Sequence, residues 1–175
     1  MKRVIVLCMS LAMVFLAMAQ RVSVVISKGA SAREQYAAEY LQKKLTDLGY
    51  TIVSKKADCT ISLYCLGSGA SEGYSISRDK KAVSTGFQGI VVTGNDPSGV
   101  IYGCVELADR IRQKGSLDIE PTTETPGMVM RGTCIGLQKT VYLPGHAVYE
   151  YPYTPVNFPW FYDKQEWIKY LDMMV

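Results

Sequence analysis

The chain has 175 residues and a formal net charge of +3, and 48% of its residues are apolar against 20% charged. That length fits one ordinary domain, or one domain and part of another, and the apolar fraction excludes a disordered chain. Two positive charges, Lys2 and Arg3, fall in an expected leader, so the rest of the chain is almost neutral. A nucleic-acid binder needs a concentrated basic face, and this balance therefore predicts no nucleic-acid partner.

Residues 1–19 are predicted to be a signal peptide. A positive start is followed by an apolar run over 4–15 and by a small-x-small cleavage site at Ala17-Met18-Ala19. The apolar run is shorter than the ~20 residues that a membrane-spanning helix needs. We therefore expect an exported protein, periplasmic or secreted from a Gram-negative type of cell, with no membrane insertion after cleavage.

The segment 20–116 is predicted to be an α+β domain. Its first helix begins at Ser31, where Glu34 completes a capping box, and it ends at Gly49. Its apolar positions follow helical spacing: Ala37, Leu41, Leu45 and Leu48. β-rich runs predict strands over 21–27, 50–53, 59–66, 73–78 and 89–93, with 82–85 as a further candidate.

A second helix is predicted from Asp96 as N-cap and Pro97 as first helical residue, and it ends at Gly115. Its expected buried stripe consists of Val100, Cys104, Leu107, Ala108 and Ile111. Runs of strands flanked by two helices favour a mixed β-sheet with both helices packed on one face.

Nothing in this domain predicts catalysis, a metal or a cofactor. The turn over 94–99 lacks the Walker ending and the GxGxxG spacing, so we interpret it as a turn and helix cap. The one histidine, His146, lies outside the domain, which argues against Ser-His or Cys-His chemistry and a zinc site there. The mature cysteines are expected to be buried thiols: Cys59, Cys65, Cys104 and Cys134.

Composition changes after Gly115. Residues 117–126 are rich in threonine and bracketed by prolines, which predicts a linker. Residues 128–137 are expected to form a strand, and an aromatic, proline-containing loop follows. The last predicted helix has Asp163 and Glu166 as a capping pair and one apolar face formed by Trp167, Tyr170, Leu171 and Met174. One β/α unit cannot bury both its faces, so we expect further β/α repeats beyond Val175.

Several segments together resemble a known domain. They are Tyr36–Leu41, Leu48–Tyr50, Glu72–Ile76 and, above all, the G-x-D-x-x-G-x-x-Y-G stretch from Gly94 to Gly103. They are similar to the small α+β domain that precedes the catalytic barrel in α-glucuronidases and β-N-acetylhexosaminidases. That domain is called zincin-like for its shape and binds no zinc. Met130-Arg131-Gly132 and Trp167–Leu171 resemble the start of the (β/α)₈ barrel, which implies a truncated TIM barrel over 127–175.

The resemblance implies the N-terminal, non-catalytic portion of an exported glycoside hydrolase that acts on O-glycosidic bonds of a poly- or oligosaccharide. In hexosaminidases the arginine at the matching place holds sugar hydroxyls, which implies that role for Arg131, with an ordinary ion pair as the alternative. The catalytic acids are expected beyond Val175, in a barrel that this chain contacts in cis, and the chain alone is expected to be inactive.

Two non-enzymatic interpretations compete with this one. In the first, the chain is a carbohydrate-binding module whose stacking platform includes Tyr151, Trp160 and Tyr162, because aromatic faces suit the apolar faces of sugars. In the second, the aromatic loop over 149–162 of an envelope protein docks a protein partner. Burial of these rings against a barrel helix is a third possibility that the sequence leaves open.

Overall fold

The computed structural model describes residues 20–79, 88–132, 155–156 and 158–174. The chain divides into two compact units, residues 1–126 and 127–175. The expected signal peptide and the candidate strand over 82–85 lie outside the described residues.

The first unit contains a six-stranded sheet with the strand order β2-β1-β3-β5-β4-β6. The strands are β1 Arg21–Val25, β2 Thr51–Ile52, β3 Cys59–Cys65, β4 Tyr74–Arg78, β5 Gln88–Gly94 and β6 Thr122–Glu124. β1 runs parallel to β2 and β3, and β3 runs parallel to β5. β4 runs antiparallel to both β5 and β6, so the sheet is mixed, as the sequence predicts.

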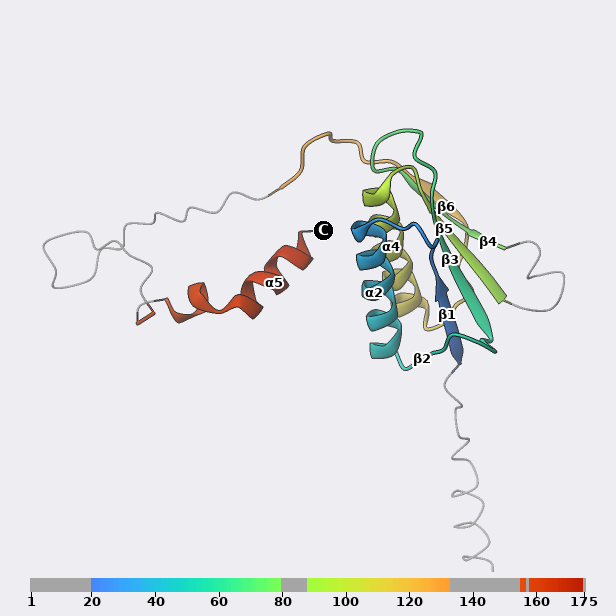
Figure 1. Ribbon diagram of the computed structural model, residues 1–175, viewed down its shortest axis with the longest axis horizontal. Helices are drawn as coiled ribbons and strands as arrows, with labels where there is room; N and C mark the ends of the chain where they lie inside the picture. The colour runs from blue at the N-terminus through green and yellow to red at the C-terminus, as the bar shows by residue number, and fades with distance from the viewer. Residues whose placement is uncertain (1–19, 80–87, 133–154, 157, 175) are drawn as a thin grey trace, which may run out of the picture. The chain divides into compact units, whose positions relative to one another are not determined.

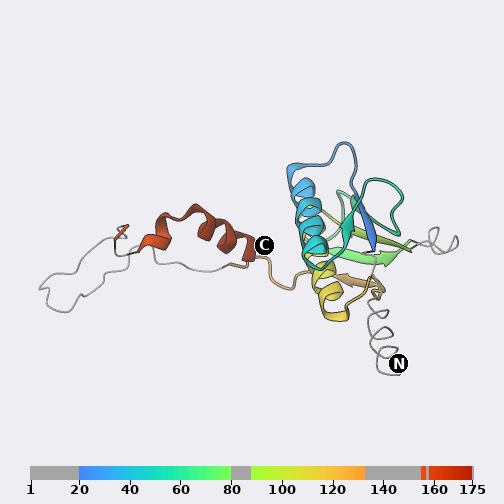
Figure 2. The ribbon, with the colours of Figure 1, turned by 90° about the horizontal axis from the view of Figure 1, so that it is seen from below.

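Two helices, α2 (Ala32–Asp47) and α4 (Pro97–Lys114), pack side by side on one face of this sheet (Figures 1 and 2). Both begin at the predicted caps: the Ser31–Glu34 capping box closes on α2, and Asp96 caps α4 with Pro97 in its first turn. α4 ends at Gly115, whose φ of 67° places it in the left-handed region that favours glycine. The predicted α+β architecture is therefore confirmed for this unit.

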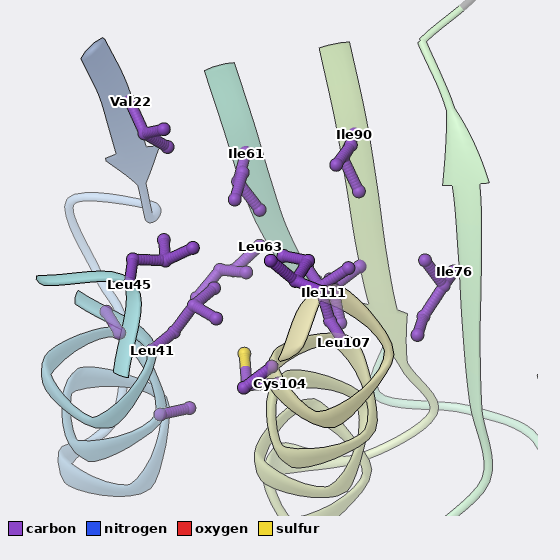
Figure 3. Close-up of a cluster of buried hydrophobic side chains, with 14 of the residues drawn as sticks. Val22, Leu41, Leu45, Ile61, Leu63, Ile76, Ile90, Cys104, Leu107 and Ile111 are labelled. Carbon is purple, nitrogen blue, oxygen red and sulfur yellow. The ribbon is translucent and has the colours of Figure 1, made fainter. Parts of the chain in front are cut away.

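The core lies between the sheet and the two helices. Figure 3 shows side chains of α2 and α4 meeting those of β1, β3, β5 and β4. All five residues of the stripe predicted for α4 are buried. Gly103 lets α4 approach the sheet closely, since a Cβ there would lie 2.6 Å from the Val92 side chain.

The predicted linker over 117–126 is wrong for most of its length. Leu117 and Ile119 are each only 5% exposed and belong to the core, and β6 adds an edge strand beside β4. Arg78 holds the segment in place, because its guanidinium donates to the Ile119 carbonyl at 3.3 Å and pairs with Asp118. The alternation Leu-Asp-Ile-Glu is a strand-like pattern, and the threonines and prolines that follow it suggested a linker instead.

The second unit contains a 3₁₀ turn, η1 (Pro159–Tyr162), and the helix α5 (Lys164–Met173). Asp163 caps α5 as predicted, and its carboxylate accepts the Gln165 N–H at 2.8 Å. The predicted capping partner Glu166 instead accepts from Lys169 Nζ at 2.6 Å.

The strand predicted over 128–137 is not formed in its described part, where residues 128–132 are exposed and lie in no strand. A strand needs a neighbouring edge to satisfy its backbone groups, and the described residues of the second unit contain no such edge. Residues 133–137 lie outside the described residues. Among the described helices, none has the length and apolar content needed to cross a bilayer.

Candidate carbohydrate-contact site

The Gly94–Gly103 motif is built around the carboxylate of Asp96. One oxygen accepts the Gly99 N–H at 2.8 Å, which caps α4. The other oxygen accepts the Glu72 N–H at 2.7 Å and the Ser71 hydroxyl at 3.3 Å. Partial burial alone raises the pKa of Asp96, but these hydrogen bonds outweigh it and lower the pKa below its ordinary value. A single carboxylate therefore fastens the loop before β4 to the start of α4.

The glycines of this region let the two segments interlock. A Cβ on Gly99 would clash with the carbonyl oxygen of Gly73, and a Cβ on Gly73 would lie 2.5 Å from Asn95 Nδ2. Asn95 donates from Nδ2 to the Ala70 carbonyl and from its backbone N–H to the Gly73 carbonyl, both at 2.8 Å. The motif is a structural clasp, and its anionic Asp96 occupies the place that a phosphate would need, which supports the turn-and-cap interpretation.

Two thiols of the first unit, those of Cys59 and Cys104, are buried in the core. Burial raises the pKa of Cys59 to about 11 and that of Cys104 to about 12. The expected burial is confirmed for Cys59 and Cys104 but is wrong for Cys65, which is half-buried near the end of β3, and Cys134 lies outside the described residues. In the described ranges, no three His, Cys, Asp or Glu side chains gather in a way that could hold a metal ion.

The structure places Arg131, the predicted sugar contact, at the exposed start of the second unit. Its Nη1 donates to the Met128 carbonyl at 2.9 Å. Tyr151 lies outside the described residues. Trp160 and Tyr162 lie on η1 and are 48% and 58% exposed, so neither ring is buried against the helix.

The aromatic residues of η1 pack against the first turns of α5. The Phe161 ring meets the Trp167 ring edge-on, with centroids 5.5 Å apart and planes at 82°. Trp167 also donates its indole N–H to the Phe161 carbonyl at 2.8 Å. These contacts fix the indole of Trp167 relative to the 3₁₀ turn and leave the rings on either side of Phe161 exposed.

A pocket of about 360 Å³ lies between η1 and α5 and is lined by Trp160, Glu166, Trp167 and Tyr170. We refer to these four residues as the aromatic pocket. The rings of Trp160 and Trp167 are 6.1 Å apart and tilted by 43°, while Tyr170 meets Trp167 edge-on at 6.1 Å. Tyr162, a predicted platform residue, lies outside this lining, and its ring contacts Phe161 at 5.5 Å.

Sequence reasoning found Trp160 but did not assign the other three lining residues to a site. Trp167 and Tyr170 were interpreted as part of an apolar helix face, and Glu166 as a cap. Their spacing along the helix was a usable signal, because residues three and four apart lie on one side of a helix.

The first unit is a mixed six-stranded sheet covered on one face by two helices, and the family match defines its class as a domain of a glycoside hydrolase. The chain belongs to the family described as glycosyl hydrolase family 20, domain 2, whose family model matches residues 13–126. The resemblance expected from the Gly94–Gly103 motif is thereby confirmed.

Among solved structures, the chain is similar to a GH138 enzyme targeting pectin rhamnogalacturonan II, at 46% sequence identity and a TM-score of 0.70. The similarity covers 88% of this chain and 22% of that enzyme, so the chain spans about a fifth of the enzyme's length. A search of curated proteins gave no match.

Proposed function

We propose that the chain is the N-terminal, non-catalytic portion of an exported glycoside hydrolase, with a catalytic (β/α)₈ barrel that begins within residues 127–175. The similarity to the GH138 enzyme carries this proposal. It covers a larger share of the chain than residues 1–126 could supply alone, so it extends past the family match into the second unit. The substrate class that this similarity favours is a plant cell-wall polysaccharide of the pectin type.

The lowered pKa values of three carboxyl groups, Asp58, Asp96 and Asp118, support a non-catalytic role for the first unit. Glycoside hydrolysis uses two carboxyl groups ~5–9.5 Å apart, one of them an acid with a raised pKa. The hydrogen bonds from Arg21 lower the pKa of Asp58 to about 2. The charges of Arg78 and Lys114 likewise lower the pKa of Asp118. These shifts, like that of Asp96, are opposite to what a general acid requires. We therefore place the catalytic acids on barrel strands beyond Val175, where barrel enzymes carry their chemistry.

Arg131 and Trp160 are the residues of this chain that we propose to contact sugar, whereas Tyr162 lies outside the lining of the aromatic pocket. We also propose that residues 1–19 direct export. The exposure of Trp160 also favours a second candidate, a non-enzymatic carbohydrate-binding module.

Hydrolysis assays separate the two candidates. We expect the full-length protein to release sugar from rhamnogalacturonan II oligosaccharides, while residues 20–126 alone release none. Replacing Arg131 with Ala is expected to reduce kcat/KM by an amount equivalent to ~2–4 kcal/mol, the scale of a charged hydrogen bond lost in a site shielded from water. The Tm should stay unchanged. Saturable binding without hydrolysis of any pectic or aryl glycoside would establish the binding module instead.

A further inference from the structure

The aromatic pocket contains both tryptophans of the chain, Trp160 and Trp167, together with Tyr170 and one carboxylate, Glu166. Its volume of about 360 Å³ falls in the range of small-molecule sites, ~300–1,000 Å³. A mixed lining of aromatic rings and a few polar groups is typical of such sites, because rings supply contact area while polar groups fix orientation.

The walls of the pocket are held in place by contacts within the second unit. The hydrogen bond from the Trp167 indole to the Phe161 carbonyl ties α5 to η1. Asp163 caps α5 at its N-terminus, immediately before the turn that carries Glu166 and Trp167. Because Trp167 is already fixed by this hydrogen bond, a ligand does not have to order that side chain on binding.

The charge of the pocket decides which class of ligand it fits. Aromatic rings beside a lone carboxylate suit an organic cation, but Glu166 is paired with Lys169 at 2.6 Å, on the adjacent turn of the same helix. The hydrogen bond from Lys169 to Glu166 raises the pKa of the lysine, so the ammonium form persists at neutral pH. The pair has no net charge. Lys169 lies outside the lining and balances the charge of Glu166, whose carboxylate oxygens line the pocket and can accept hydrogen bonds from hydroxyl groups.

We propose that the aromatic pocket is a binding subsite for a neutral pyranose ring. The apolar C–H face of the sugar lies against Trp160 and Trp167, and its hydroxyls hydrogen-bond with the Glu166 carboxylate. The choice of a sugar as ligand rests on the proposed function, and the subsite deepens it by assigning an uncharged sugar residue to this part of the chain.

Because Trp160 and Trp167 are the two tryptophans of the sequence, the intrinsic fluorescence of the 175-residue chain reports on this pocket. We would titrate the chain with methyl galactopyranoside, methyl rhamnopyranoside and neutral oligosaccharides of the same sugars. A saturable change in emission is expected. Tetramethylammonium chloride and sodium glucuronate serve as cationic and anionic probes, and neither is expected to produce a saturable change.

Three variants test the assignment. Trp160→Ala is expected to weaken sugar binding by about tenfold, the upper scale of one aromatic contact. Glu166→Gln, an exposed substitution that leaves the rings in place, is expected to weaken it severalfold, as followed by the emission of both tryptophans. Tyr162→Ala is the matched control, because this ring is exposed on the same 3₁₀ turn but does not line the pocket. It should bind as wild type.

A preference for tetramethylammonium, an equal loss in Tyr162→Ala, or no saturable response to any sugar would overturn the subsite. The proposed function is judged separately, by hydrolysis in the full-length protein. Hydrolysis that is unaltered in kcat/KM by Trp160→Ala and Glu166→Gln, with no fluorescence response, would refute the subsite and leave the hydrolase standing. A sugar-dependent fluorescence response in a protein that hydrolyses no glycoside would support the subsite and refute the proposed hydrolase.

Discussion

Replacing Asp96 with Ala tests whether one carboxylate fastens two segments of the first unit. The substitution removes the acceptor of the Gly99 N–H, at 2.8 Å, and of the Glu72 N–H, at 2.7 Å. Loss of an N-cap side chain costs ~0.5–2 kcal/mol, and loss of the acceptor for a partly buried N–H adds ~1 kcal/mol. We expect the free energy of unfolding to fall by ~2 kcal/mol and the Tm by about 10 °C for a domain of this size.

Urea unfolding followed by far-UV circular dichroism measures this change. Asp96→Asn keeps a side-chain oxygen for the Gly99 N–H but places an amide nitrogen where the Glu72 N–H needs an acceptor, so about half of the loss is expected. Asp47→Ala is the matched control, because this carboxylate is exposed near the end of α2. It should leave the Tm almost unchanged. An Asp96→Ala variant as stable as Asp47→Ala would show that the Asp96 carboxylate does not stabilise the domain by joining the two segments.

The pH dependence gives a second check on Asp96. Its pKa is lower in the folded state than in the unfolded chain, so its stabilising contribution is present above the unfolded pKa of ~3.9 and is lost as the pH falls through the folded pKa. The difference in unfolding free energy between wild type and Asp96→Ala should therefore be largest near neutral pH. It should shrink below about pH 4. A difference that stays constant down to pH 2 would mean that the carboxylate charge plays no part.

Two further predictions concern the same unit. Gly99→Ala should destabilise the domain by ~2 kcal/mol or more, because the new Cβ clashes with the backbone oxygen of Gly73. Gly29→Ala is the control, because a Cβ there meets nothing within 4 Å, and its Tm in the same thermal melt should be unchanged. Arg21→Gln should raise the pKa of Asp58 from about 2 toward its ordinary value, as read by carboxyl carbon NMR titration. The stabilisation that Asp58 contributes is lost as the pH falls from ~3.9 to about 2. An unchanged pKa of Asp58 in Arg21→Gln would show that the guanidinium does not cause the lowered pKa.

Local chemistry made the helices predictable. Ser31 with Glu34, and Asp96 with Pro97, are capping signals that act within three residues, so no tertiary information is needed to interpret them. The left-handed backbone of Gly115 likewise follows from its own lack of a side chain. The predicted buried stripe of α4 is confirmed because helical periodicity is a property of the segment's own sequence.

The segment over 117–126 was not predictable in the same way. Leu117 and Ile119 are buried in the core, and the segment is held by contacts that include a hydrogen bond from Arg78, 41 residues earlier in the chain, to the Ile119 carbonyl. β6 has three residues and exists through its pairing with β4. Nothing within the segment specifies that pairing. Its threonines and prolines are compatible with a linker and with an edge strand, and the tertiary contact decides between them.

The aromatic pocket shows a similar limit. The sequence marks Trp160 and Tyr162 as equally good platform residues, since both are aromatic and flank Phe161. The 3₁₀ turn separates them, because it presents Trp160 to the ring of Trp167 and leaves Tyr162 against Phe161. A hydrogen bond from the Trp167 indole to the Phe161 carbonyl joins this turn to α5. The amino-acid composition of the segment does not predict that hydrogen bond.

The two units use their polar and aromatic groups in opposite ways. In the first, Asp58 and Asp96 are held by hydrogen bonds within the domain, and their lowered pKa values suit structure rather than acid catalysis. In the second, Trp160 and Glu166 remain accessible around a pocket. If the two units have these separate roles, variants of each unit should change a different measurement. Clasp variants at Asp96 should change stability without changing sugar-dependent fluorescence, and pocket variants at Trp160 and Glu166 should change that fluorescence without changing the Tm of the first unit. Variants that moved both readouts together would mean that the clasp shapes the sugar site, and the assignment of binding to the second unit alone would fail.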